Sequence, residues 1–253
     1  MKMSNFDYTP ELYDLQVNWQ QRLSKEKEFF EKIFAQKKVS SMLDIGCGTG
    51  RHAEFFSDYV DSVTAIDPSR EMINYAKERV IRSGKIKLME GGFENLDTLV
   101  RQQFDLIVCL GNTLPILGNR RNVKLALKNT RKKLAAGGLA IFQFLNFEPK
   151  IMEKNRFYAP KILSKDDKKY IFIKHFEFGK INTRADFLIT QLSSDDKIEN
   201  FFVHTSYFCT LRKNLFLKMA TNSGFKKIEL LGTGGLGEFN KNTDISLYAL
   251  MHN

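Results

Sequence analysis

A glycine-rich turn directly after a short apolar run constrains this chain more than any other feature. The segment MLDIGCGTGR covers residues 42–51, and Gly46, Gly48 and Gly50 occupy alternate positions in it. Glycine at this density costs chain entropy, so it marks a place where the backbone takes a positive φ or a ligand approaches closely. Asp44 lies two residues before the first glycine and adds a carboxylate to the same turn.

The segments around this turn alternate between strand and helix patterns. Five apolar runs predict strands, at residues 40–45, 62–67, 85–92, 104–111 and 139–146. Helical patterns lie before and between them, at residues 22–36, 51–60, 68–84 and 122–138. Strands that alternate with helices in this way predict an α/β fold with a doubly wound, mostly parallel sheet.

The pattern changes after residue 146. Three alternating runs without helices between them follow within residues 168–208: KKYIFIKHFEF, INTRADFLITQL and KIENFFVHTSYF. They predict an antiparallel β meander inserted after the fifth strand. A final helix and two strands then return the chain to the first sheet, with an antiparallel C-terminal strand. We therefore expect a binding domain at 1–150 and 209–253, with an N-terminal helical segment at 1–38, and an inserted substrate or lid subdomain at 151–208.

Composition excludes several classes of protein. Hydrophobic residues make up 43% of the 253 residues and charged residues 27%, the profile of an ordinary soluble globular protein. No run approaches the roughly 20 apolar residues that span a bilayer, and the polar N-terminus has no signal-peptide core. We therefore expect a cytoplasmic protein that does not bind membranes. The three cysteines are far apart and not in metal-ligand spacing, so no metal site is expected.

The glycine turn discriminates between nucleotide ligands. A phosphate-binding loop of the Walker type needs Lys followed by Ser or Thr after the last glycine, whereas Arg51 and His52 stand there. A dinucleotide fingerprint needs the spacing G-x-G-x-x-G, and this turn is G-x-G-x-G. The remaining candidate ligand is a nucleoside without a pyrophosphate.

Asp67 ends the second predicted strand and supports the same interpretation. It lies 21 residues after Gly46 (67 − 46), close to the spacing of about 20 at which an acidic side chain accepts the ribose hydroxyls in nucleotide-binding folds. The alternative is that Asp67 caps the helix that begins near Pro68 and Ser69.

The segments LDIGCGTG, AIDPS and LAAGGLAIF together resemble three motifs of the class I S-adenosylmethionine-dependent methyltransferases. The resemblance covers residues 40–146 closely, and it implies a Rossmann-like methyltransferase fold with S-adenosyl-L-methionine as the cofactor. The glycines would let the methionine part of the cofactor lie against the backbone, while Asp44 would order the turn or meet the cofactor's ammonium group through water. Where the family presents an acid or amide beside the adenine, this chain has Gly92, so backbone groups and the apolar face of Phe93 are the expected contacts.

The stretch CLGNT resembles the glycine N-methyltransferase and glycine/sarcosine methyltransferase group, which also carries an aromatic antiparallel insertion after the fifth strand. This resemblance implies that Leu110 packs near the cofactor, that Asn112 orients the methyl acceptor and that Arg22 pairs with the cofactor's carboxylate. The carbonyl of Gly111 would add a fixed dipole beside Asn112.

Alternatives stay open for three of these residues. Asn112 would otherwise be a strand-ending turn residue, Arg22 a solvated helix cation, and Trp19 either a cap on the cofactor or ordinary packing. The expected catalytic residues are Asn112 and Gly111. The expected cofactor-binding residues are Arg22, Trp19, Asp44, Gly46, Cys47, Gly48, Gly50, Asp67, Pro68, Met72, Gly92, Phe93 and Leu110.

The sequence thus predicts a methyltransferase that acts on a small-molecule substrate, at the nitrogen of a small amine or amino acid. Arg156 and Arg184 are candidates to bind a substrate carboxylate, and His204 and Tyr207 either face the substrate or occupy ordinary strand positions.

Two other functions stay open. The net charge of +10 and the basic run 119–133 favour an RNA methyltransferase, although a solvated helix face explains the basic run without nucleic acid as a partner. The second alternative is a non-catalytic cofactor-binding protein. Exposed strands of the meander would also allow a homo-oligomer.

Overall fold

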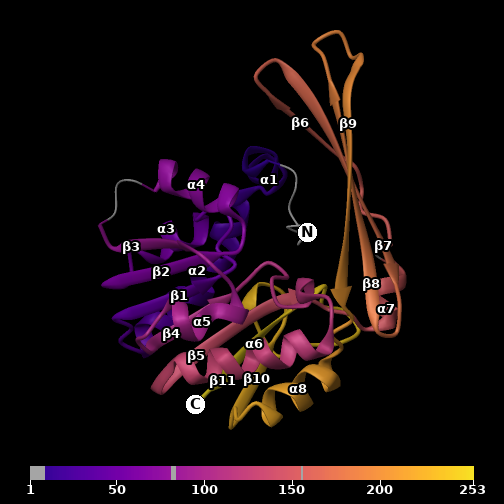
Figure 1. Cartoon of the computed structure of the whole chain (residues 1–253). Coiled ribbons are helices and arrows are strands. Elements are labelled where there is room, and N and C mark those ends of the chain that lie inside the picture. The colour runs from indigo at the N-terminus through magenta and orange to yellow at the C-terminus, as the bar shows by residue number, and fades with distance from the viewer. Residues whose placement is uncertain (1–8, 81–83, 155) are drawn as a thin grey trace.

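The computed structural model describes residues 9–80, 84–154 and 156–253 and builds them into two sheets with flanking helices (Figure 1). The helices are α1 (Pro10–Gln16), α2 (Trp19–Gln36), α3 (Arg51–Phe56), α4 (Arg70–Arg79), α5 (Leu96–Leu99), α6 (Arg120–Lys133), α7 (Pro149–Lys154) and α8 (Lys213–Asn222). The strands are β1 (Ser41–Ile45), β2 (Ser62–Asp67), β3 (Ile86–Glu90), β4 (Phe104–Cys109), β5 (Leu134–Leu145), β6 (Lys161–Lys165), β7 (Lys168–Phe178), β8 (Asn182–Leu192), β9 (Ile198–Cys209), β10 (Lys227–Leu231) and β11 (Ser246–His252).

The main sheet has seven strands in the order β10-β11-β5-β4-β1-β2-β3. β1 pairs in parallel with β2 and β4, β2 with β3, and β4 with β5, while β11 is antiparallel to both β5 and β10. The predicted α/β fold with a mostly parallel sheet and an antiparallel C-terminal strand is confirmed. Because the strand order reverses between β4 and β1, the carboxyl ends of these strands flank the crevice in which such sheets bind ligands.

The inserted meander is a separate antiparallel sheet in the order β6-β7-β8-β9. The three predicted runs correspond to β7, β8 and β9, whereas β6 is an additional strand. Most residues of β6 are exposed, so its sequence lacks the alternation of apolar and polar residues that predicts a strand. Asp166 and Asp167 join β6 to β7 with φ of 51° and 59°, the backbone that a two-residue hairpin turn requires. In Figure 1 the outer ends of β6 and β9 extend beyond α1.

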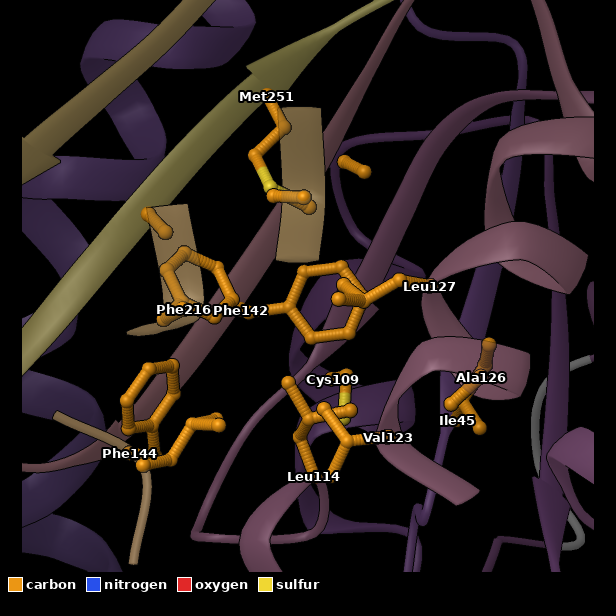
Figure 2. Packing of buried hydrophobic residues seen from close by; sticks show 14 of the residues in the cluster. Ile45, Cys109, Leu114, Val123, Ala126, Leu127, Phe142, Phe144, Phe216 and Met251 are labelled. Carbon is orange, nitrogen blue, oxygen red and sulfur yellow. The ribbon is translucent and has the colours of Figure 1, made fainter. Parts of the chain in front are cut away.

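Two buried apolar clusters cover the two faces of the main sheet. One of them packs Phe30 of α2 and Phe56 of α3 against the sheet. The other packs α6 and α8 against the opposite face, where Figure 2 shows Val123 and Leu127 of α6 near Phe142 of β5. This second cluster continues into β7, β8 and β9, so the meander shares a core with the main sheet.

Three helices end earlier than the sequence predicts, and the first of them, α3, ends at Phe56 rather than at residue 60. α6 stops at Lys133, because Leu134 is extended, buried and paired with Phe104 at the start of β5. The glycines at 137 and 138 therefore lie within an irregular part of β5 rather than at the helix end. The helix predicted over 68–84 ends at Arg79, and residues 81–83 lie outside the described part of the chain. None of the described helices is long and apolar enough to cross a membrane.

Candidate active site

A cavity of about 670 Å³ opens where β1, β2 and β4 end, at the predicted position of the ligand. Most of the residues predicted for the site line this first cavity: Trp19, Arg22, Gly46, Cys47, Gly48, Asp67, Pro68, Met72, Phe93, Leu110 and Gly111. The remaining lining residues were not among the predicted ones: Tyr13, His52, Ser69, Glu94, Thr113, Ile116, Leu117, Asn122 and Leu125.

The glycine turn lies against β2 and packs on the turn after β4. Gly46 and Cys47 both donate their N–H groups to the carbonyl of Ile66, at 2.8 and 3.0 Å. Gly46 has a φ of 77°, and a Cβ on it would overlap the side chain of Thr113. Glycine is therefore required here both by the backbone conformation and by the close approach of Thr113.

Asp67, the last residue of β2, is linked by a hydrogen bond to the glycine turn that follows β1. One of its carboxylate oxygens accepts the N–H of Gly48 and the other accepts the N–H of Ser69, both at 2.9 Å. Burial raises the pKa of Asp67 to about 6, although these two N–H donors oppose the shift. The cap of α4 is Ser69 rather than Asp67, because its hydroxyl accepts the N–H of Met72 at 3.2 Å. A carboxylate has further lone pairs, so Asp67 retains acceptor capacity for hydroxyl groups in the cavity.

Arg22 enters the first cavity from α2. Its Nε lies 3.3 Å from Glu26, and its guanidinium lies 5.3 Å from the centre of the Trp19 ring. Glu26 is buried and also bonds His52 and Tyr248, each at 2.8 Å. Burial acts to raise the pKa of Glu26, but His52, Arg22 and Tyr248 outweigh it and lower that pKa to about 2. Glu26 is therefore ionised, and it holds Arg22 in place.

Asp14 of α1 ties the N-terminal helices to the glycine turn. Its carboxylate accepts hydrogen bonds from Trp19 Nε1 at 2.8 Å, from Thr49 Oγ1 at 2.6 Å and from Arg51 Nη2 at 2.7 Å. Its neighbour Tyr13 lines the cavity. The sequence pattern does not single out Asp14, because Thr49 and Arg51 are remote from it in the chain.

The sequence predicts cofactor contacts for Asp44, Gly50 and Gly92, but none of them lines the first cavity. Asp44 is buried in β1, where burial and then the charge of Asp67 raise its pKa to about 7, and its Oδ2 has no hydrogen-bond partner among the described residues. Gly50 instead begins α3 with a φ of 77° and packs against α4. A Cβ on Gly92 would stand 2.6 Å from a carboxylate oxygen of Glu94, and it is Glu94 that lines the cavity.

A second cavity, of about 330 Å³, adjoins the first. The two share Tyr13, Arg22, Gly111 and Ile116 as lining residues. The rest of the second cavity comes from the N-terminal helices, the turns after β4 and β10, strands β5 and β11, and the meander. Its further lining residues are Gln16, Val17, Lys25, Glu26, Asn112, Gln143, Lys174, Phe187, His204, Ser206, Phe208, Thr233, Gly234, Ser246 and Tyr248. A group bound near Gly111 in the first cavity therefore has direct access to the second.

Asn112 lines the second cavity rather than the first, and its side chain also holds the end of β4. Its φ is 71°, and its Oδ1 accepts the N–H of Leu145 at 2.7 Å. Gln143 acts in the same way on Gly111, whose N–H it accepts at 2.7 Å. Because the Oδ1 of Asn112 is engaged with the backbone, its amide NH2 is the part of the side chain that can meet a ligand.

The candidate residues of the meander divide between its two faces. His204 lines the second cavity, whereas Tyr207 is exposed on the other face. Arg184 pairs with Asp186 at 3.1 Å, and neither Arg184 nor Arg156 lines either cavity. The arginines predicted to bind a substrate carboxylate are therefore not positioned to do so, because one is paired and both lie away from the cavities.

Comparison with known proteins identifies the central part of the chain. Residues 42–138 match the family model of the methyltransferase domain. The glycine N-methyltransferase of Homo sapiens is 32% identical over 141 residues, which are 50% of this chain and 48% of that protein. The glycine/sarcosine N-methyltransferase of Aphanothece halophytica is 27% identical over 139 residues, which are 54% of this chain and 52% of that protein. The chain spans about half the length of these curated relatives.

A solved structure extends the likeness to nearly the whole chain. The CcbJ methyltransferase from Streptomyces caelestis has a TM-score of 0.78 at 18% identity, with 98% of this chain and 97% of that chain covered. This likeness includes the N-terminal helices and the meander, which lie outside the match to the family model. Residues 42–138 therefore match a methyltransferase domain, and the chain as a whole has the fold of the CcbJ methyltransferase.

Proposed function

We propose that this protein is an S-adenosylmethionine-dependent methyltransferase and that the first cavity holds S-adenosyl-L-methionine. The observation that carries the proposal is that Asp67, Arg22 and the glycine turn line one cavity. Asp67 suits the two ribose hydroxyls, because it is a buried carboxylate with lone pairs left to accept them. Arg22 suits the methionine carboxylate, because a guanidinium binds a carboxylate through charge-assisted hydrogen bonds.

The other lining residues fit an adenine. Met72, Phe93 and Leu110 are buried and offer the apolar surface that a base needs. Glu94 brings a carboxylate to the place that a side chain on residue 92 would otherwise occupy, so it can accept the exocyclic amino group of the base. Glu94 thus compensates for the missing polar side chain at Gly92.

The arrangement of the two cavities fits a group transfer. S-adenosyl-L-methionine supplies, when bound, a methyl group that moves in line from a sulfonium to the acceptor atom. Gly111 lines both cavities and therefore lies where the transferred group crosses, and the amide NH2 of Asn112 orients the acceptor. Positioning of this kind supplies most of the acceleration when the acceptor atom arrives with a free lone pair. Tyr13 lines both cavities as well and excludes water from their junction.

We infer that the acceptor is the nitrogen of a small molecule. The second cavity, at about 330 Å³, is at the lower end of the volumes that small-molecule sites occupy. The relatives named above are glycine and glycine/sarcosine N-methyltransferases, which supports nitrogen as the acceptor atom.

Calorimetry with S-adenosylhomocysteine tests the cofactor site. We expect the wild type to bind it and Asp67→Ala to bind it about 100-fold more weakly, because two hydrogen bonds to a charged group are lost. Asp61→Ala, which removes an exposed carboxylate outside both cavities, should leave binding unchanged. Absence of binding heat with the wild type, at a protein concentration that would reveal micromolar affinity, contradicts the proposal.

Transfer of a labelled methyl group tests the acceptor. Label from S-adenosyl-L-methionine should appear in members of a panel of small amines and amino acids. Label in bulk tRNA and in none of the small amines would overturn the proposed acceptor class while leaving the cofactor assignment intact.

A further inference from the structure

A lysine interrupts the buried face of the meander. On β7, alternate positions carry Tyr170, Phe172, Phe176 and Phe178, and Lys174 stands in the middle of this row. Alternate residues of a strand share one face of the sheet, so a single cation lies among four aromatic side chains.

The register of the neighbouring strands places ring side chains beside Lys174. Phe187 of β8 lies directly opposite Lys174, and His204 of β9 lies directly opposite Phe187. Toward the outer end of the meander, Phe172 and Ile189 pack against α1. Toward the main sheet, the next residues of the same face join the main core. Between these two apolar clusters, Lys174 lines the second cavity.

Among the residues that the structure describes, Lys174 has an aromatic neighbour but no acidic partner. Its Nζ lies 5.6 Å from the centre of the Phe187 ring, and it takes part in none of the ion pairs found in the described ranges of the chain. Burial, together with the charges of Lys161 and Arg22, lowers the pKa of Lys174 to about 8. A partly buried cation without a counter-ion is costly in a folded protein, so its position calls for a ligand of opposite charge.

The second cavity carries an excess of positive charge. Arg22 and Lys25 line it together with Lys174, and the carboxylate among its described lining residues is that of Glu26. Glu26 already bonds Arg22, His52 and Tyr248, so it does not neutralise Lys174. An anionic group that enters this cavity therefore meets a cation that no side chain of the described residues has paired.

We propose that Lys174 binds a carboxylate of the methyl acceptor and thereby selects which amines are methylated. The inference rests on the proposed function, since it places the acceptor nitrogen at Gly111 and Asn112 and its carboxylate at Lys174 within one cavity. The same positive charge disfavours the protonated form of a nearby amine, so it favours the form that carries a free lone pair.

Pairs of methyl acceptors that differ only in a carboxylate or an amide test whether Lys174 selects acceptors with a carboxylate. Glycine and β-alanine are compared with glycinamide and β-alaninamide as methyl acceptors. The wild type should use each acid with a kcat/KM at least tenfold above that of its amide, and Lys174→Gln should remove this preference mainly through KM. Lys174→Arg should retain the preference, because it keeps the charge. Lys168→Gln, on the same strand but paired with Glu199, should leave it unchanged. Equal use of acids and amides by the wild type overturns the inference.

A binding measurement makes the test independent of turnover. Acetate and inorganic phosphate are titrated by calorimetry into protein saturated with S-adenosylhomocysteine. Acetate should bind the wild type at least tenfold more tightly than Lys174→Gln, while both proteins bind S-adenosylhomocysteine equally. Equal acetate binding by the two proteins, or tighter binding of phosphate than of acetate, overturns the inference and leaves the cofactor assignment standing. Failure of the wild type to bind S-adenosylhomocysteine counts instead against the proposed function.

Discussion

At the scale of single residues, two carboxylates of the main sheet are buried and have raised pKa values. Asp67 ends β2 and Asp44 is the penultimate residue of the adjacent β1, and burial raises the pKa of Asp44 to about 7 and that of Asp67 to about 6. Ionisation of either group therefore costs folded-state stability. Of the two, only Asp67 lines the first cavity, where hydroxyl groups of a ligand that donate hydrogen bonds to its carboxylate would offset this cost.

Asp44→Asn should therefore stabilise the free protein at high pH. The folded-state pKa of Asp44 is raised from 3.8 to about 7, so its stabilising contribution is complete below about pH 4 and is lost as pH rises through 7. The asparagine variant does not ionise. Its Tm should exceed that of the wild type by several degrees at pH 8, since 1 kcal/mol corresponds to roughly 2–4 °C in a chain of this size.

Thermal unfolding of both proteins between pH 4 and pH 8 measures this difference in Tm. It should shrink as the pH falls toward 4. Asp61→Asn, at an exposed position, provides the control and should show no such trend. A difference between wild type and Asp44→Asn that stays constant across the range contradicts the role given to burial of Asp44.

At the scale of secondary-structure elements, α1 and the start of α2 form one side of the first cavity. Asp14 attaches α1 to the rest of this side. Its carboxylate accepts hydrogen bonds from Trp19 of α2, from Thr49 of the glycine turn and from Arg51 of α3. α1 has seven residues and is too short to be stable alone. Its position therefore depends on these hydrogen bonds and on its packing against the meander.

Asp14→Ala should loosen this attachment and speed release of S-adenosylhomocysteine by about tenfold, with little change in Tm. Trp19 lines the first cavity and is the only tryptophan in the sequence, so its fluorescence reports the release of S-adenosylhomocysteine in stopped-flow experiments. Asp58→Ala is the matched control, since Asp58 is exposed on the surface. Unchanged release from Asp14→Ala would show that the attachment of α1 through Asp14 does not control the release of S-adenosylhomocysteine.

At the scale of the whole molecule, we expect the edge of the meander to mediate self-association. β9 is an edge strand, and its outer half exposes Ile198, Phe201, Phe202 and Val203. An exposed apolar edge strand presents unpaired backbone groups and apolar side chains to a second copy.

Sedimentation velocity should show a concentration-dependent dimer for the wild type, and the double variant Phe201→Lys, Val203→Lys should shift it toward monomer. Ile181→Lys changes an equally exposed apolar residue at the turn between β7 and β8, and it should have no effect. A wild type that stays monomeric up to about 100 μM contradicts the expectation, because edge pairing of this kind should be populated there.

Some residues that the sequence does not single out nevertheless left a signal in it. Glu26 lies on the same helical stripe as Trp19, Phe30 and Ile33, and Lys174 interrupts the alternation of β7. Glu26 and Lys174 thus share one sequence signal, which is a charged residue on an otherwise apolar face. The pattern alone did not say whether such a residue is solvated, paired or ligand-binding, because that depends on elements packed against it.

The sequence by itself determined the α/β fold, the glycine turn and the position of Asp67, because periodicity, positive φ and the spacing from one strand end to the next are local properties of the chain. Only the tertiary structure decided how Arg22 is held, since Glu26 meets Tyr248 across 222 residues of sequence. It also decided that Lys174, and neither Arg156 nor Arg184, lines the second cavity, and that Glu94 rather than Gly92 lines the first. These contacts depend on how strands and helices pack, and no local pattern carries that information.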